Sequence, residues 1–384
     1  MGILRTNTLS GIGTDGPVFD GVTRLDTFGY VVPPVGVTSD RTLVGVTTAQ
    51  GSIRFNTDSQ KLEFYAQDQW FEMVIDTPAL AVGSNTGAGA RGVFGGGIEA
   101  GNVNTIEYIN VSSTGNATDF GDLVSARDSV NSASSSTRGL FCGGGPSTNI
   151  IEYITISSTG NTQDFGDMTR VTGHQFTTSN ATRALNAGGP EGASPSNIID
   201  YVTIASTGNA VDFGDLTIAR WGAGGGRSNS TRALFLAGYL SPSTGYNTID
   251  FVTISTLGNA QDFGDALDGQ YGSGAGNSSS KIRAFIAGGN STIGPTPGGN
   301  NVIQTVLFMT LGNATDFGDL SRYVRGTGSL SDSTRGVYGG GAPGYMNIID
   351  YFLMSQSGNA VDFGDLSANR AFNPAGLSNG HGGL

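Results

Sequence analysis

One phrase, Asp-Phe-Gly-Asp, occurs six times along the chain and constrains its fold more than any other feature. Successive copies are 45, 48, 50, 54 and 46 residues apart, counted between Phe120, Phe165, Phe213, Phe263, Phe317 and Phe363. A regular period of about 50 residues indicates a repeat architecture, in which each repeat is one small supersecondary unit. The chain therefore cannot be interpreted as an ordinary single-core domain.

Two further markers accompany each copy in a fixed order. The first is an arginine before a short apolar run that leads to glycines: Arg91, Arg138, Arg183, Arg232, Arg283 and Arg335. The second is an acidic–aromatic pair in most repeats: Glu107-Tyr108, Glu152-Tyr153, Asp200-Tyr201, Asp250-Phe251, Gln304-Thr305 and Asp350-Tyr351. The pair's second residue always precedes the phenylalanine by 12 residues, whereas its distance from the arginine varies from 15 to 22. The length variation therefore lies in one loop per repeat.

Each repeat is interpreted as four short strands. In the second repeat these are expected at residues 129–134, 138–142, 150–156 and 163–168, and a Ser-Thr-Gly-Asn turn joins the last two. No window shows a 3.6-residue apolar period, so almost no helix is expected. Four-stranded units that stack around an axis bury one another's faces. The sequence predicts an all-β fold in which residues 79–384 form a six-bladed β-propeller.

The C-terminal segment is expected to close this ring. Residues 370–380 resemble the first strand of a repeat, and they keep its arginine, Arg370, and its Ser378-Asn379 pair. We expect this segment to pair with the strand that starts near Arg91. Deleting residues 370–384 is then expected to lower the melting temperature sharply.

Charge excludes some classes of partner. The net charge is −12, and the only lysines are Lys61 and Lys281. A nucleic-acid-binding surface needs clustered Lys and Arg to neutralise phosphates, so no nucleic-acid partner is expected. No apolar stretch approaches the roughly 20 residues that span a bilayer, so no membrane insertion is expected.

The cysteine and histidine usage predicts no cofactor or metal site. Cys142 is the only cysteine, so the chain cannot form an internal disulfide or a cysteine-based zinc site. His174 and His381 are the only histidines, and each is expected to be a solvated side chain in a Gly/Ser-rich loop.

The order of features over residues 79–384 resembles the kelch repeat: a small-residue strand, an apolar strand that ends in glycines, an acidic–Tyr strand and an aromatic strand. An arginine also follows the last strand in several repeats, as Arg127, Arg220 and Arg370 do. Kelch blades usually carry Trp where this chain has Phe, and the distance from the Tyr to that aromatic is longer here. The resemblance therefore implies a kelch-like blade.

The N-terminal residues have a different pattern. Residues 51–58, 61–65 and 69–72 read as three alternating strands with Asp-rich turns. This module, residues 51–78, resembles a small β-module of tail-fibre and other appendage proteins of tailed bacteriophages. The propeller repeat is similar to repeats in structural proteins of marine phages. Residues 1–50 are expected to be an extended anchor or linker.

The resemblance implies a location in the virion. It implies that residues 1–78 bind other virion proteins and that the chain is a homo-oligomer or present in many copies. An alternative is a cellular kelch-type scaffold for protein interactions. A propeller glycan hydrolase is a further alternative, but every acidic motif recurs in several repeats, which argues for structure and against an enzyme.

The Asp-rich turns leave one question open. Asn116, Asp119 and Asp122, with their equivalents in each repeat, offer oxygen ligands of the kind that calcium prefers. The same side chains also cap turns by bonding nearby backbone amides. We favour the second interpretation, and no metal site is predicted.

The variable loops are the candidate contact face. In a propeller the equivalent loops of all blades emerge at one end, and loops commonly carry binding. Aromatic and Met side chains are enriched at interfaces. The candidate contact residues, which are expected to meet a neighbouring virion protein or a host surface protein or glycan, are Tyr239, Tyr246, Pro295, Pro297, Tyr345 and Met346. The alternative is that these side chains only cover the end of the propeller.

Overall fold

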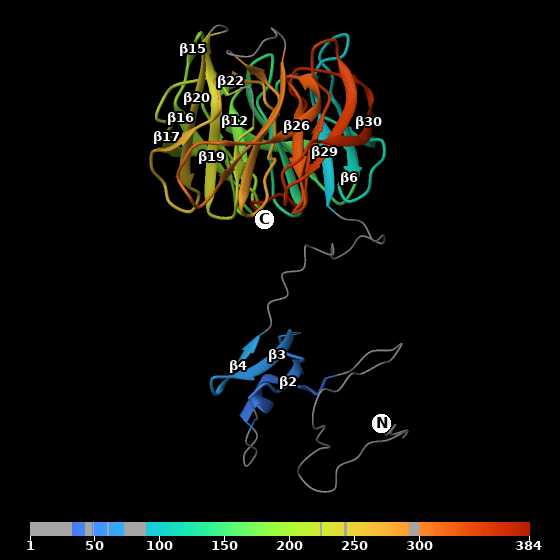
Figure 1. Ribbon diagram of the computed structural model, residues 1–384, viewed down its shortest axis with the longest axis vertical. Coiled ribbons are helices and arrows are strands. Elements are labelled where there is room, and N and C mark those ends of the chain that lie inside the picture. The colour runs from blue at the N-terminus through green and yellow to red at the C-terminus, as the bar shows by residue number, and fades with distance from the viewer. Residues whose placement is uncertain are drawn as a thin grey trace. The chain divides into compact units, whose positions relative to one another are not determined.

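The protein is all-β in a computed structural model that describes residues 33–42, 48, 50–59, 61–72, 90–222, 225–241, 244–291 and 299–384. The chain divides into two compact units, residues 1–76 and 77–384 (Figure 1). A single 3₁₀ helix is the only helix among these described residues. The expectation of an all-β fold is confirmed.

The N-terminal unit contains one four-stranded sheet with the order β1-β2-β3-β4. Its elements are β1 (Val35–Gly36), η1 (Thr38–Thr42), β2 (Ile53–Asn56), β3 (Lys61–Ala66) and β4 (Gln69–Glu72). β1 pairs parallel with β2, and the other neighbours pair antiparallel. The three strands expected in residues 51–72 are present. Residues 33–42 belong to the segment that was expected to be an extended anchor or linker, and they form β1 of this sheet and the 3₁₀ helix η1.

The C-terminal unit contains six successive antiparallel sheets within the described ranges. Three of them are β8 (Asn131–Ser134), β9 (Arg138–Cys142), β10 (Thr148–Thr155) and β11 (Gln163–Thr172); β12 (Phe176–Ser179), β13 (Arg183–Ala187), β16 (Ile198–Thr203) and β17 (Val211–Asp215); and β18 (Arg227–Ser228), β19 (Arg232–Ser241), β20 (Thr244–Thr253) and β21 (Gln261–Asp265). The four strands expected in the second repeat correspond to β8–β11.

One of the remaining three sheets has three strands instead of four. They are β23 (Arg283–Ala287), β25 (Asn300–Leu307) and β26 (Thr315–Val324); β27 (Gly328–Ser331), β28 (Arg335–Gly339), β29 (Met346–Leu353) and β30 (Val361–Arg370); and β31 (Ala375–Ser378), β5 (Arg91–Gly95), β6 (Thr105–Asn110) and β7 (Thr118–Asp122). Two short pairs lie outside these sheets: β14 (Pro190–Glu191) with β15 (Ser194–Pro195), and β22 (Gln270–Tyr271) with β24 (Asn290–Ser291). The fifth sheet has three strands, since only the isolated bridge from Ser279 to Ala284 stands where a first strand would pair.

The last strand of the chain pairs with the first strand of the C-terminal unit. β31 runs antiparallel to β5, and Ala375 lies opposite Gly95. The expected pairing of residues 370–380 with the strand near Arg91 is therefore confirmed. In Figure 1 the red C-terminal strands lie beside the cyan strands that begin this unit.

The apolar core lies between neighbouring sheets. Val93 and Phe120 of the β31-β5-β6-β7 sheet belong to one buried cluster with Phe141 and Ile154 of the next sheet. The phenylalanine of the Asp-Phe-Gly-Asp phrase fills this gap, and the Phe120 ring meets that of Tyr108 edge-on at 6.1 Å. Burial of aromatic rings is a large stabilising contribution in such junctions.

The Asp-Phe-Gly-Asp phrase of one repeat meets the Gly-Asn turn of the next repeat at the outer edge of each junction. The Gly160 N–H donates to the carbonyl oxygen of Phe120, and the Asp122 N–H donates to Asn161 Oδ1 at 3.1 Å. The Gly-Asn turn of one sheet thus binds the fourth strand of the sheet before it. The same amide-to-asparagine bond, at 3.1 Å each time, joins Asp167 to Asn209, Asp215 to Asn259, Asp265 to Asn313, Asp319 to Asn359 and Asp365 to Asn116.

Six serine residues form a closed cycle at the inner strands. The Ser134 hydroxyl donates to the Ser378 carbonyl at 2.7 Å, and the Ser179 hydroxyl donates to the Ser134 carbonyl at 2.8 Å. The cycle continues from Ser228 to Ser179, from Ser279 to Ser228, from Ser331 to Ser279 and from Ser378 to Ser331. Each sheet supplies one serine, or the segment before its first strand does, so the cycle links the sheets in chain order and joins the last to the first.

The histidines are not the solvated side chains that the sequence suggested. His381 is buried beside the serine cycle, with Nδ1 at 2.8 Å from Asn277 Nδ2 and Nε2 at 3.1 Å from the Ser134 carbonyl oxygen. Burial lowers the pKa of His381 to about 4. His174 is half-buried, and burial lowers its pKa as well. The glycine- and serine-rich sequence next to each histidine suggested a solvated loop, but these segments line a packed interior.

Candidate contact face

The loops between the second and third strands lie at one end of the C-terminal unit. The β14–β15 hairpin is part of such a loop, and it lies at the upper end of this unit in Figure 1 together with β22. The C-terminus lies at the opposite end. The variable loops and the chain terminus are therefore separated by the length of the strands.

An arginine clamp holds the base of most of these loops. Arg220 Nε donates to the Ala237 carbonyl at 2.8 Å, and its Nη1 donates to Asp250 Oδ2 at 2.9 Å. Ala237 lies at the register shift within β19 and Asp250 lies on β20, so one guanidinium ties together the two strands that flank the loop. The corresponding ion pairs are Arg127–Glu152, Arg170–Asp200, Arg322–Asp350 and Arg370–Glu107.

These ion pairs are buried, which indicates that their role is structural. Both side chains of the Arg220–Asp250 pair are fully buried. Burial lowers the pKa of Arg220 and the neighbouring carboxylate opposes this change. Burial also raises the pKa of Asp350, against the attraction of Arg322. A buried pair of this kind tolerates loss of one partner poorly, because the other is left as an uncompensated charge. The acidic position of the repeat is thus held in a structural ion pair.

The fifth sheet lacks this ion pair. Gln304 stands at the acidic position, and Gln270 stands in the segment that carries the arginine elsewhere. Gln304 Oε1 accepts from the Leu267 N–H at 2.8 Å, and Gln270 Oε1 accepts from Asn300 Nδ2 at 3.3 Å. These two positions of the fifth sheet therefore carry uncharged side chains in place of the ion pair.

The β19–β20 hairpin extends beyond its sheet toward the loop end. The register shifts between Leu236 and Gly238, and Ala237 takes a φ of 57°. Gly238 has a φ of 118°, and a side chain there would lie 2.6 Å from the Trp221 carbonyl oxygen. Glycine at this position thus allows the hairpin to bend against the preceding segment, and Tyr239 pairs with Trp221 through two backbone bonds of 2.9 Å.

Three aromatic rings form a cluster at the base of this hairpin. The Tyr239 ring lies 5.2 Å from that of Trp221 and 4.5 Å from that of Tyr271. Asn290 Nδ2 bonds the Tyr271 hydroxyl. Tyr239 was expected to be exposed, but only 8% of it is accessible, and burial raises its pKa to about 12. The bulge turns its ring inward, so Tyr239 supports the face and does not form its outer surface.

The other candidate residues lie in different parts of this end. Tyr246 is half-buried on β20, in the same hairpin as Tyr239. Tyr345 is 42% exposed and Met346 is half-buried, and both lie at the start of β29, two sheets further along the chain. Pro295 and Pro297 lie outside the described residues. Leu240, next to Tyr239, is 42% exposed.

Trp221, Tyr271 and Asn290 were not among the sequence candidates. Trp221 and Tyr271 follow the fourth strand of their repeats, where the spacing hardly varies. The sequence candidates, in contrast, all come from the variable loops. The sequence signal was available, because Trp221 is one of only two tryptophans in the chain.

The Asp-rich turns bond backbone amides of the neighbouring sheet. Asn116 Oδ1 accepts from the Asp365 N–H, while Asp119 is exposed and Asp122 is half-buried. Within the described ranges, no group of three or more His, Cys, Asp and Glu side chains could hold a metal ion. None of the described residues forms a helix long and apolar enough to cross a membrane.

No protein-family model matches the chain, and no curated protein matches it.

Proposed function

We propose that the C-terminal unit is a six-bladed, kelch-like β-propeller. The support for this is the cyclic order of the contacts between its sheets. The serine cycle passes through six positions and returns to its start, since Ser134 binds Ser378. The Gly-Asn turns follow the same order, and Asp365 binds Asn116 of the first repeat. A linear stack would leave its first and last repeats unpaired.

The chain is proposed to be a phage virion appendage protein that the N-terminal region anchors to the particle. The observation that carries this proposal is the polarity of the C-terminal unit. The Arg91 N–H donates to Asn379 Oδ1 at 2.8 Å, so the first described residues of this unit lie beside its last ones. The variable loops project from the other end. An anchored protein whose chain enters at one end presents the opposite end to a partner.

The chemistry of the loop end suits contact with a protein or a glycan. Aromatic rings, an amide at Asn290 and the exposed Leu240 and Tyr345 lie there. Aromatic side chains with a nearby polar group are enriched at interfaces. Catalysis is not part of the proposal, because an arginine binds the carboxylate of the acidic–aromatic pair in five of the sheets. A hydrolase would need two carboxyl groups free to act on substrate.

Three substitutions test this proposal: Leu240→Ala, Tyr246→Ala and Tyr345→Ala combined in one protein. Tyr239 is kept, since its truncation would leave a cavity in the aromatic cluster. Particles with the triple variant should attach to host cells or assemble less well, with an unchanged melting curve of the purified chain.

The matched control is Leu257→Ala with Leu311→Ala. Both leucines are exposed, and both lie in turns between third and fourth strands, at the end away from the variable loops. This control should attach and assemble normally. Unaltered attachment and assembly in the triple variant would refute the proposed contact face.

A further inference from the structure

Residues 381–383, with the sequence His-Gly-Gly, bind the segments that carry the serine cycle. The His381 imidazole bonds the Ser134 carbonyl of β8 and the Asn277 side chain of the fifth repeat. The Gly382 N–H donates to the Ser279 carbonyl at 2.9 Å. We call the residues that surround this segment the tail site: Ser134, Ser179, Ser228, Asn277, Ser279 and Ser280.

The hydrogen bonds of the tail site determine the protonation state of His381. Its Nε2 carries a proton, because the Ser134 carbonyl can only accept. Its Nδ1 carries none, because the Asn277 Nδ2 amide at 2.8 Å and the Gly383 N–H at 3.1 Å both donate to it. The Asn277 Oδ1 accepts from the Ser228 N–H, which sets the orientation of this amide. The site therefore fits a neutral imidazole, and a proton on Nδ1 would face two donors.

Only glycine fits the two positions after the histidine. A side chain on Gly382 would lie 2.2 Å from the Ser280 carbonyl oxygen, and one on Gly383 would lie 2.2 Å from the Ser179 carbonyl oxygen. Both obstacles are backbone atoms, which cannot turn aside as a flexible side chain can. Glycine commonly marks a place where another backbone approaches closely. The tail site is thus selective for His-Gly-Gly.

The surroundings of His381 offer no negative charge to an imidazolium. The segments that pack against residues 381–383 are 131–135, 177–180, 227–230 and 277–281. Their only charged residues are Arg227 and Lys281, both cations, and Arg227 directs its guanidinium to backbone carbonyl oxygens. Asp332, near Gly380, accepts from backbone amides of its own turn. Protonation of the bound histidine would therefore bury a charge that no described group compensates.

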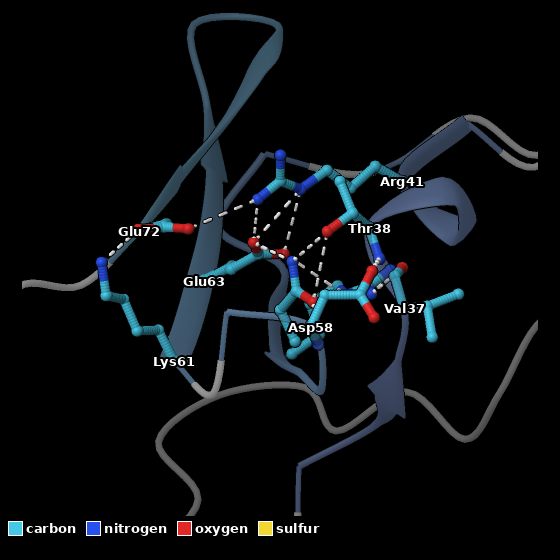
Figure 2. Close-up of polar contacts among 9 residues, drawn as sticks. Val37, Thr38, Arg41, Asp58, Lys61, Glu63 and Glu72 are labelled. Carbon is cyan, nitrogen blue, oxygen red and sulfur yellow. Dashed lines mark hydrogen bonds and ion pairs between the residues drawn. The ribbon is translucent and has the colours of Figure 1, made fainter.

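Glu63 of the N-terminal sheet is the opposite case. Its carboxylate is also fully buried, but it accepts from Arg41 Nε at 3.1 Å, and Arg54 Nε lies 3.4 Å from it. Figure 2 shows the Arg41 guanidinium over this carboxylate. The bond to Arg41 lowers the pKa of Glu63, so this group is charged where it is buried. Burial acts without such compensation on His381 and lowers its pKa to about 4.

We propose that the tail site is a pH-sensitive binding site for a His-Gly-Gly segment, which it holds while the histidine is neutral and releases when the histidine is protonated. In this chain the segment is residues 381–383 of the same molecule. An exposed histidine has a pKa of about 6.5. Binding is therefore at full strength above about pH 6.5 and weakens as the pH falls towards 4, because the released segment takes up a proton more readily than the bound one. This inference goes beyond the proposed function and does not depend on it.

Hydrogen exchange of single backbone amides in the full-length chain tests the proposal. The Gly382 amide reports on the tail site, because its bond to Ser279 must break before it exchanges. After correction for the intrinsic exchange rate, its protection should fall by roughly 50- to 100-fold between pH 7.5 and 4.5, as the two pKa values of the histidine require. At both pH values it should be less protected than the amides of β9, a strand that is paired on both sides.

Three variants separate the histidine from the glycines. His381→Gln does not titrate, so its Gly382 protection should be the same at both pH values. Gly382→Ala should lose the protection of the Gly383 amide at both pH values, because the new methyl group meets the Ser280 carbonyl. The matched control is Gly101→Ala, which adds a methyl group where nothing lies within 4 Å and should behave as the wild type.

Three results would overturn the proposal. The first is a Gly382 protection that is equal at pH 7.5 and 4.5 in the wild type. The second is an equal fall in His381→Gln, since another group would then cause the release. The third is equal protection of Gly382 and of the β9 amides, since residues 381–383 would then leave only when the sheets unfold.

Discussion

Gln270 and Gln304 take the place, in the fifth sheet, of the buried arginine and carboxylate that clamp the loops of the other sheets. Both charges are replaced there, and neither charge is left alone. A single buried charge costs several kcal/mol, whereas removal of both members can be nearly neutral. The chain itself thus indicates how its arginine clamps respond to substitution.

Arg127→Gln should destabilise the C-terminal unit by about 3–5 kcal/mol, because Glu152 would remain buried without its partner. The double variant Arg127→Gln with Glu152→Gln should recover a large part of this loss. A glutamine at this position can still accept the hydrogen bond that the Val124 N–H donates to Glu152. Chemical unfolding of both variants measures the difference. A double variant that is less stable than Arg127→Gln would contradict this account.

Two glycines with nearly equal backbone angles should respond differently to alanine. Gly121 has a φ of 148° and Gly160 one of 152°. A side chain on Gly121 would lie 2.4 Å from the Gly160 carbonyl oxygen, whereas one on Gly160 would meet nothing within 4 Å. Gly160→Ala should cost about 1–3 kcal/mol from backbone strain, and Gly121→Ala should cost more than Gly160→Ala, because the neighbouring turn must move as well. Equal melting temperatures would show that this junction is not tightly packed.

Acid should destabilise the protein through His381. Its pKa in the folded chain is about 4, below the ordinary value of 6.5. The unfolded chain therefore binds a proton at higher pH than the folded one, so stability is full above about pH 6.5 and falls as the pH is lowered towards 4. The full effect is about 3 kcal/mol. His381→Gln should lose less stability than the wild type between pH 7 and 4.5 in denaturant titrations, and equal losses would exclude this role for His381.

Removal of residues 371–384 should lower the melting temperature by about 10 °C or more. The truncation keeps Arg370 and its bond to Glu107, but it removes β31, its pairing with β5 and one member of the serine cycle. Ser378→Ala is the control for the hydroxyl alone and should cost about 1 kcal/mol. A truncated chain that melts like the wild type would mean that β31 contributes little to closure.

The repeat allowed the strands and the C-terminal pairing to be predicted from the sequence. The phrase around Phe120 recurs in all six repeats, and its spacing of 12 residues from the position of Tyr108 is constant, because both residues lie in junctions that recur in each sheet. The inward turn of Tyr239 could not be predicted, since it depends on one bulge at Ala237. The burial of His381 depends on long-range packing of the C-terminus against Ser134, which no local pattern reports.

The candidate contact face was only partly predictable. Loop length indicated the end of the C-terminal unit that we propose as the contact face, and with it Tyr246 and Tyr345, whose contact role stays a prediction. It did not reveal Trp221 or Tyr271, because these residues lie in segments of nearly constant length and gain their position through contacts with Tyr239 of the β19–β20 hairpin.

Electron cryomicroscopy of the intact particle that carries this chain tests the central claim most directly. The account predicts a ring of six blades, connected to the particle from the end at which Ala90 and the C-terminus lie, with the variable loops facing outward or toward a neighbouring protein. A ring with another number of blades, a linear stack of sheets, or attachment through the variable-loop end would contradict it.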